Sequence, residues 1–420
     1  MTLPRILDLS AIPLIDGHCH SISASFQESS VEGFLGIFTE AVDPRLLAHH
    51  VPQSVTYRRA IRDLAAFLGC AANAEMVLQA RRHRPDYLAA LGRQAGIRGL
   101  LVDSAYPTDT LSLAQLRVGF TCHVGEVLRI ETLAEELIRT APGFESFEAQ
   151  FRESLQAAKQ RGVVALKSIV AYRSGLAVET IPPSEAGQAF QPLKALVERQ
   201  GYLRLTAKVF LDYCVGMALE EAQRLELPVQ FHTGFGDPDI DLVTANPALL
   251  RPILANPRYA GVPIILLHMG YPYVRESAFL ASLYPDVYVD LSLAVPLLRP
   301  ILPHLLQELL ALAPATKLLY GSDAHSQPEM FWLGARYARW ALGQVLAEWI
   351  DDDTLEEPEA LEIAHRMCFR NALEVYRLDP SWLAGTIAAT STSERMLPSP
   401  GSESAFECVG VSDPLKMRLQ

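Results

Sequence analysis

The 420-residue sequence lacks the features that mark several large classes of protein. Its six cysteines stand far apart with no Cys-x-x-Cys pair, which argues against a zinc ribbon or a disulfide framework and fits a reducing compartment. It has no run rich in Lys and Arg, and its formal net charge is -12, so nucleic acid and anionic membrane are not expected partners. No apolar run approaches the length of a membrane span, and Met1 to Ser10 lacks the pattern of a signal peptide. We expect a cytoplasmic protein that acts on a small molecule, and a homo-oligomer is compatible with these features.

What the sequence does contain is a series of eight short apolar runs, separated by segments with helical periodicity. The predicted strands are Ile12 to His20, Ile97 to Ser104, Arg117 to Ile130, Val163 to Val170, Pro228 to His232, Val262 to His268, Val287 to Leu291 and Lys317 to Ser322. The helices predicted between them include Tyr57 to Leu68, Phe147 to Arg161, Ala207 to Leu225 and Pro300 to Leu312.

This alternation predicts a parallel sheet covered by helices, and eight units favour an α/β fold of the (β/α)8 TIM-barrel type. A doubly wound sheet is the main rival. It is disfavoured because Asp-Gly-His-Cys-His follows the first strand where a glycine-rich phosphate loop would stand.

The chain divides into a predicted barrel over residues 1–378 and a tail over residues 379–420 that is rich in Ser, Thr, Pro and Gly. We expect the tail to be largely disordered. Within the barrel, residues 39–92 read as a helical insertion over the barrel mouth, either a lid or an oligomer contact. Residues 180–193, with Ile-Pro-Pro-Ser-Glu, read as a loop.

Residues that commonly bind metals stand at the ends of five predicted strands. His18 and His20 lie two residues apart, so an extended strand points both imidazoles to one face. The carboxyl ends of parallel barrel strands meet on one face, where functional residues gather. The further candidates at these strand ends are Lys167, His232, His268 and Asp323.

Taken singly, each of these residues has an ordinary structural explanation. A histidine after a strand is commonly a hydrogen-bonded structural residue, and an aspartate there is commonly a helix N-cap. Lys167 differs, because a lysine inside an apolar run is costly unless its ammonium is paired, exposed or modified. Five such strand ends in one barrel therefore predict a metal site.

The order His-x-His, Lys, His, His, Asp on strands one, four, five, six and eight resembles the amidohydrolase superfamily of metal-dependent barrels, from about Pro13 to Leu378. Three segments resemble more closely the amidohydrolase-type domain that is fused to a glutamine-synthetase-like domain in some fungi and plants. They are Ala-Leu-Lys-Ser-Ile-Val-Ala-Tyr-Arg-Ser-Gly-Leu (165–176), Leu-Leu-His-Met-Gly-Tyr-Pro-Tyr (266–273) and Tyr-Gly-Ser-Asp-Ala-His-Ser (320–326).

This resemblance implies roles for the matched residues. His18, His20 and Asp323 match the ligands of the first metal, for which Zn²⁺ is the expected ion and Mn²⁺ or Fe²⁺ are alternatives. In binuclear members a carboxylated Lys167 would bridge two ions, with His232 and His268 holding the second. In mononuclear members His232 would join the first ion, and His268 would act as acid/base or polarise the substrate. Both arrangements stay open, and an unmodified Lys167 could instead stay cationic and bind a substrate carboxylate.

Other polar residues near these strand ends are candidates for substrate binding. Tyr172 and Arg173 follow the fourth strand, and an arginine there could clamp a carboxylate with two hydrogen bonds. Arg129 and His325 are weaker candidates. For all of them a surface salt bridge or loop hydrogen bond is the competing explanation.

These observations predict a metal-dependent hydrolase that cleaves a C–N bond of a small amide. The resemblance implies that Asp323 takes the proton of a metal-activated water and passes it to the leaving amine. A carboxylate-bearing substrate such as a γ-glutamyl amide is suggested by family association alone. The alternatives are a non-oxidative metal-dependent decarboxylase and, from another class, a catalytically silent barrel that binds or regulates a partner.

Overall fold

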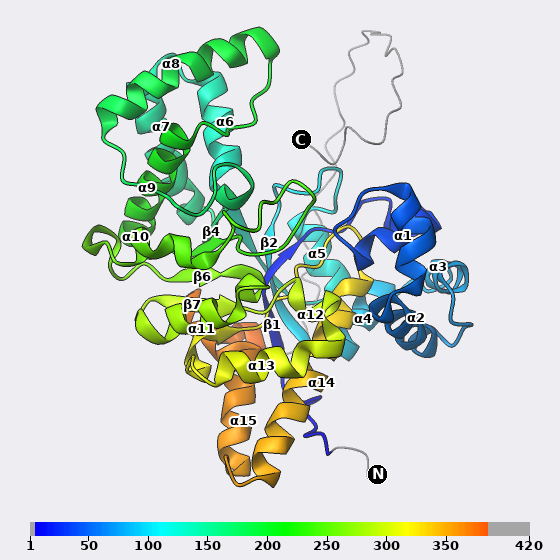
Figure 1. Ribbon diagram of the computed structural model, residues 1–420. Coiled ribbons are helices and arrows are strands. Elements are labelled where there is room, and N and C mark those ends of the chain that lie inside the picture. Colours follow the sequence, from blue (N-terminus) through cyan, green and yellow to red (C-terminus); the bar gives the residue numbers. More distant parts are fainter. Residues whose placement is uncertain (1–4, 385–420) are drawn as a thin grey trace, which may run out of the picture. The chain divides into compact units, whose positions relative to one another are not determined.

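The structure is a computed structural model that describes residues 5–384. One sheet contains eight parallel strands, and each strand pairs with the next along the chain (Figure 1). Backbone hydrogen bonds cross from the first strand to the segment around the last, from Gly17 N to Tyr320 O (2.9 Å) and from His20 N to Ala324 O (2.8 Å). The protein is therefore an α/β TIM barrel. Its strands are β1 (Leu14–His20), β2 (Ile97–Asp103), β3 (His123–Arg129), β4 (Val163–Ser168), β5 (Val229–Phe231), β6 (Ile264–Leu266), β7 (Val287–Asp290) and β8 (Leu318–Leu319).

Helices surround the strands and follow them in the chain (Figure 1). The α-helices are α1 (Val31–Leu35), α2 (Val55–Leu68), α3 (Ala74–Arg82), α4 (Tyr87–Ala95), α5 (Leu113–Phe120), α6 (Ile130–Thr140), α7 (Phe144–Gln160), α8 (Pro183–Gln200), α9 (Lys208–Leu225), α10 (Arg251–Leu254), α11 (Val274–Leu283), α12 (Ala294–Leu297), α13 (Leu302–Leu310), α14 (Glu329–Asp351), α15 (Glu357–His365) and α16 (Asn371–Val375). None of the described helices is both long enough and apolar enough to cross a membrane.

All eight predicted strands are present, but two predicted segments are wrong. The third strand was expected from Arg117, yet the chain is helical there until Phe120, because Ser112 and Gln115 form a capping box that starts α5. The segment 180–193 was expected to be a loop, yet α8 begins at Pro183. A proline is tolerated in the first helical turn, where its missing N–H would have no partner, so the Pro-Pro pair begins a helix.

The inside of the barrel is filled by apolar side chains that alternate with outward-facing ones along the strands. Ile15, Leu101, Val127 and Ala165 belong to one buried cluster, which Tyr376 beyond α16 also joins. Gln230 Nε2 donates to Tyr376 Oη (2.9 Å) and to the carbonyl of Gly17 (2.7 Å) within this barrel. A larger apolar core lies between the sheet and the helices. The barrel is thus packed below its carboxyl end and cannot act as a pore.

The predicted tail begins with an ordered turn. Residues Pro380–Leu383 form a 3-10 helix, and the Trp382 ring stacks on His123 with 5.2 Å between centroids. A Cβ at Gly99 would lie 2.6 Å from the Trp382 ring, so glycine lets the indole pack directly against β2. The rest of the predicted disordered tail lies outside the described residues.

The segment predicted as a helical insertion carries α2, α3 and α4. A fully buried ion pair fastens it to α14, since Arg81 Nη1 lies 2.9 Å from Glu329 Oε1 and both side chains are 0% exposed. Tyr87 Oη donates to the same carboxylate at 2.9 Å. A charge buried without such partners would be strongly destabilising, so these contacts fix the insertion on the barrel. Its role as a lid or an oligomer contact stays a prediction.

Candidate metal centre

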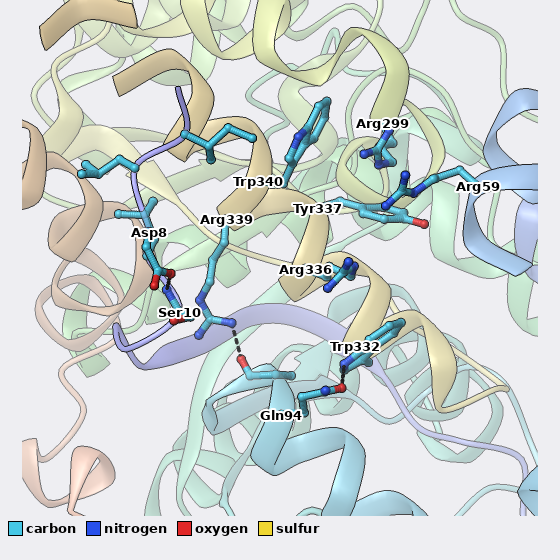
Figure 2. Close-up of a pocket in the computed structure, with 14 residues that line it drawn as sticks. Asp8, Ser10, Arg59, Gln94, Arg299, Trp332, Arg336, Tyr337, Arg339 and Trp340 are labelled. Carbon is cyan, nitrogen blue, oxygen red and sulfur yellow. Dashed lines mark hydrogen bonds between the residues drawn. The ribbon is translucent and has the colours of Figure 1, made fainter. Parts of the chain in front are cut away.

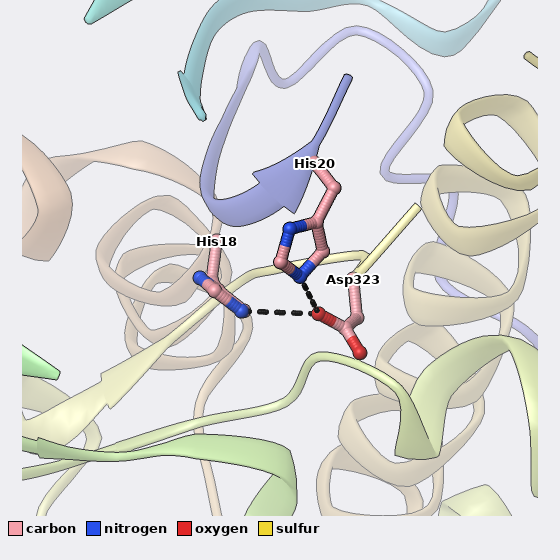
Figure 3. Close-up of side chains that lie close together, drawn as sticks. All are labelled: His18, His20 and Asp323. Atoms are coloured by element: carbon pink, nitrogen blue, oxygen red, sulfur yellow. Dashed lines mark ion pairs between the residues drawn. The ribbon is translucent and has the colours of Figure 1, made fainter. Parts of the chain in front are cut away.

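Three of the predicted ligands converge at the carboxyl end of the barrel (Figure 3). The Nε2 atoms of His18 and His20 lie 3.0 Å and 3.3 Å from Asp323 Oδ1. The side chains of His18, His20 and Asp323 are 0%, 9% and 11% exposed. One ligand atom from each residue lies within 4.8 Å of the others, the spacing expected when three ligands share one ion.

The backbone at this corner sets the position of Asp323. Ser322 and Asp323 both donate their N–H groups to the carbonyl of His18, at 3.2 Å and 2.9 Å. Asp323 has a φ of 55°, a left-handed conformation that aspartate tolerates better than most residues. Asp16 accepts hydrogen bonds from the N–H (2.9 Å) and hydroxyl (2.5 Å) of Ser322. These bonds hold the carboxylate against the two imidazoles.

The donor atoms at this corner fit a cation. His20 Nδ1 lies 3.1 Å and 2.9 Å from the carbonyl oxygens of Asp103 and Tyr106, which can only accept, so Nδ1 carries a proton. In a neutral imidazole the Nε2 lone pair then faces Asp323 Oδ1. Two lone pairs that face one another in a buried site repel, and a divalent ion between them removes this repulsion. His18, His20 and Asp323 are therefore the residues that would hold a metal.

The protonation states of these ligands agree with this assignment. Burial, followed by the nearby Lys167 charge, lowers the pKa of His18 to about 4, so its imidazole is neutral at physiological pH. Burial opposes the charge on Asp323, but the charge and hydrogen bonds that His268, His18 and His20 offer when protonated hold the pKa of this carboxyl well below its usual range. Neutral imidazoles and an ionised carboxylate are the forms that bind metals.

Lys167 lies beside the first ligand, with Nζ 3.0 Å from His18 Nε2. Burial, opposed by the charges of Asp103 and Asp323, lowers the pKa of this buried lysine to about 8. At pH 7 about a tenth of this amine is thus neutral, and the neutral amine is the form that can react with carbon dioxide. The predicted carboxylation of Lys167 is chemically accessible from this environment.

His232 and His268 face one another. His232 Nε2 lies 3.1 Å from the carbonyl of Phe235, so Nε2 carries the proton and His232 Nδ1 accepts one from His268 Nε2 at 3.0 Å. His268 Nδ1 lies 3.0 Å from Ser292 Oγ and 4.0 Å from Asp323 Oδ2, and Ser292 Oγ donates to Asp290 Oδ1. An ion bound by His232 Nδ1 would replace the hydrogen bond between the two rings. His268 has a φ of 65°, a left-handed conformation that residues other than glycine seldom adopt.

The four residues predicted to bind substrate differ in their surroundings. The Tyr172 ring lies 4.3 Å from the His232 ring, and Tyr172 Oη accepts the N–H of Asp237. Arg129 is committed to Asp103, whose Oδ2 it contacts at 3.0 Å and 2.6 Å.

The other two candidates differ in their partners. Arg173 is 8% exposed, with Nη2 3.6 Å from Glu135 Oε1 on α6. Its Nε and Nη1 have no hydrogen-bond partner among the described residues. His325 Nδ1 lies 3.2 Å from the hydroxyl of Ser326, a local loop contact.

Two strand ends that the sequence prediction omitted also belong to this region. Asp103 ends β2 and joins Arg129 to His20 through its carboxylate and carbonyl. Asp290 ends β7 and accepts the N–H of Ser292 at 2.8 Å. Burial raises the pKa of Asp290 to about 7. In the sequence Asp103 and Asp290 each follow an apolar run, which is the same pattern that predicts Asp323 as a ligand.

An eight-stranded parallel barrel with His-x-His on its first strand and an aspartate after its last is the architecture of metal-dependent barrel enzymes. A family model described as Amidohydrolase matches residues 216–378, which include His232, His268 and Asp323. A protein of Lactobacillus casei described as a metal-dependent hydrolase has a crystal structure with a TM-score of 0.79 and 29% identity, covering 89% of this chain and 98% of that one. The resemblance to the amidohydrolase superfamily is thus supported by a family model and by a solved structure that matches nearly the whole barrel.

Two further matches show how much of this chain is similar to other known proteins. Protein fluG of Emericella nidulans is 28% identical over 401 residues, which cover 87% of this chain and 46% of that protein. The chain thus spans about half the length of this curated relative. Glucuronate isomerase from Caulobacter crescentus has a TM-score of 0.64 at 16% identity, covering 89% of this chain and 93% of that one, a likeness of fold alone.

Proposed function

We propose that this protein is a metal-dependent hydrolase that cleaves a C–N bond of a small amide. The observation that carries the proposal is the buried convergence of His18, His20 and Asp323 at the carboxyl end of the barrel. The 29% identity to a metal-dependent hydrolase over nearly all of that chain supports the same class. Zn²⁺ is the ion we propose, because imidazole and carboxylate ligands with an open position suit it.

In the proposed hydrolysis, the metal ion, Asp323 and His268 have separate roles. A divalent ion in this site supplies Lewis-acid activation of a water molecule and of the substrate carbonyl. Asp323 Oδ1 faces the histidines, while Oδ2 is directed toward His268 Nδ1. Because Asp323 is ionised, Oδ2 can take the proton of the attacking water and return it to the leaving amine. His268 lies between Asp323 and Ser292, so its imidazole is placed to hold or pass a proton near the reacting carbonyl.

We propose a substrate that bears a carboxylate, such as a γ-glutamyl amide. Arg173 supports this, because its guanidinium is buried and two of its nitrogens have no hydrogen-bond partner among the described residues. Donor groups left without a hydrogen bond on a buried guanidinium are costly, and a substrate carboxylate that accepts two hydrogen bonds from them offsets that cost.

The test is a substrate screen on the metal-loaded protein. Release of ammonia or amine from γ-glutamyl amides and other N-acyl compounds is measured alongside release of carbon dioxide from aromatic and other carboxylic acids. We expect amine release that depends on added Zn²⁺ or Mn²⁺. Carbon dioxide release without amine release would instead establish the decarboxylase alternative.

A variant pair tests the role of Asp323, with metal content measured beside kcat in both proteins. Asp323→Asn is expected to lower kcat by about 10³-fold, within the range of general acid/base contributions. Asp351→Asn changes a half-exposed carboxylate that pairs with Arg5, and it should leave kcat unchanged. A protein that binds no metal under any loading condition would support the silent binding barrel.

A further inference from the structure

A second pocket lies beside the barrel, between the N-terminal segment 6–10, the end of α4 and the first half of α14 (Figure 2). Its volume is about 450 Å³, within the range of small-molecule sites. It shares no lining residue with the candidate metal centre. Trp332 and Tyr337, which are 4% and 1% exposed, form part of its wall.

Four guanidinium groups surround this pocket in a chain whose net charge is -12. Among the described lining residues the single carboxylate is Asp8. Asp63 behind the wall is shared, since Arg59 contacts it with two nitrogens at 2.8 Å and Arg336 lies 3.4 Å away. Positive charge therefore exceeds negative charge here. The four arginines that line the pocket are Arg59, Arg299, Arg336 and Arg339.

Arg299 is the residue whose contacts point most directly to a ligand. Its guanidinium carbon lies 4.0 Å from the centroid of the Trp340 ring and 5.1 Å from that of Tyr337. These aromatic contacts hold the side chain in place. Arg299 makes no ion pair with a described carboxylate, and its Nε is buried without a hydrogen-bond partner in the described part of the chain. A positioned guanidinium without an anion is a ready receptor for one.

Arg336 and Arg339 extend this receptor along α14. Arg336 stands over the Trp332 ring at 5.5 Å and is half exposed, so its remaining N–H groups are available to a ligand. Arg339 donates to the carbonyls of Ala95 and Ile12 at 2.6 Å each, which fixes its planar group at the wall. The pocket thus combines fixed guanidinium groups with flat aromatic surface (Figure 2).

We propose that this pocket binds a phosphate group, either free or as the monoester of a small molecule. Phosphate suits it better than a single carboxylate, because a dianion with three free oxygens can accept from several guanidinium groups at once. The indole of Trp332 and the apolar side chains of Leu7 and Leu9 offer a surface for the organic part of a monoester. A docked acidic peptide is the competing occupant, but the volume of about 450 Å³ and the buried Trp332 and Tyr337 in the wall favour a compact ligand.

The test measures binding of two probes, inorganic phosphate and AMP, to the full-length metal-loaded protein. Two of the four tryptophans line the pocket, so tryptophan fluorescence reports occupancy, and calorimetry gives the Kd. We expect saturable binding with a Kd below about 1 mM for at least one probe. Tighter binding of AMP identifies a monoester site, and equal binding identifies a site for the phosphate group itself.

Substitutions of the pocket arginines show whether the probes bind in this pocket. Arg299→Gln and, separately, Arg336→Gln are expected to raise the Kd about tenfold or more, the effect of losing a charge-assisted hydrogen bond. Arg275→Gln is the matched control, because Arg275 is 80% exposed on α11 and outside the pocket. Circular dichroism and metal content show whether each variant is folded. If one arginine variant is misfolded, the other still tests the proposal.

A third substitution separates this pocket from anion binding at the metal centre. Asp323→Asn should leave the Kd of both probes unchanged. The proposal is overturned if neither probe saturates, if Arg299→Gln and Arg336→Gln bind as tightly as Arg275→Gln, or if binding is lost in Asp323→Asn but kept in the arginine variants.

Discussion

Two histidine pairs stand at the carboxyl end of this barrel, and their surroundings differ. The β1 pair, His18 and His20, aims both Nε2 atoms at one carboxylate oxygen of Asp323. The β5/β6 pair, His232 and His268, is joined by a hydrogen bond between its own rings. One residue type at equivalent strand ends thus meets two different sets of partners. The partner on the second nitrogen decides which lone pair is free, and so whether an imidazole is arranged to bind a metal or to handle protons.

The largest expected effect comes from breaking the β1 pair. His20→Asn removes a proposed metal ligand, so metal content and activity should fall by more than the 10–100-fold that outer-sphere changes typically cost. Elemental analysis and kcat/KM on the same preparation measure this. His304→Asn, a 70% exposed histidine on α13, serves as the control. A His20→Asn protein with full metal content would remove the β1 pair from the ligand set.

The next effect concerns Lys167, which contacts the β1 pair. Its pKa of about 8 lies below the ordinary 10.5, so between these values the unfolded chain binds more protons than the metal-free folded protein. The stability of that protein should therefore rise with pH from 8 to 10.5, by about 3 kcal/mol from this residue.

Urea unfolding of the metal-free protein at several pH values measures this contribution as the difference from Lys167→Met, which lacks it. Lys159→Met on α7 should keep the wild-type slope. Equal slopes in wild type and Lys167→Met would show that the lysine keeps an ordinary pKa or is modified.

His268→Asn tests the β5/β6 pair and should have a smaller effect. We expect kcat to fall about 10²-fold because the group that faces the reacting carbonyl is altered. At least one equivalent of metal should remain, since the β1 pair and Asp323 are intact. A loss of one of two equivalents would instead show that His268 holds a second ion, and complete loss of metal would contradict the comparison between the pairs.

The smallest effect is expected from Ser292→Ala. Ser292 Oγ lies 3.0 Å from His268 Nδ1 and orients that ring without being a ligand itself. A few-fold lower kcat with unchanged metal content is expected, the scale of one neutral hydrogen bond. Ser282→Ala removes a hydroxyl that bonds only locally to the carbonyl of Phe279 and should have no effect. A normal kcat in Ser292→Ala would show that the backbone, and not the Ser292 hydroxyl, orients the His268 ring.

The sequence was sufficient to predict the barrel, because buried parallel strands are nearly continuous apolar runs and their number suggests closure. It also identified His18, His20 and Asp323 by their place at strand ends. Asp103 and Asp290 carried the same signal but were overlooked, since an aspartate after a strand is common.

Other features could not be read from local pattern. The hydrogen bond between His232 and His268 depends on a left-handed turn at His268, which a non-glycine residue rarely adopts. The commitment of Arg129 to Asp103 depends on the pairing of β2 with β3. The start of α8 at Pro183 was misjudged because prolines begin helices as well as turns.

The seam between β1 and the segment after β8 has a consequence for how the chain folds. His18 and His20 come near the start of the barrel, and Asp323 comes after its last strand. The ligand set therefore assembles only when the final strand has been synthesised and docked. An ion held there ties the two ends of the sheet together like a cross-link that closes a loop of about 300 residues. A metal bound at this seam would therefore favour complete barrels over partly folded ones.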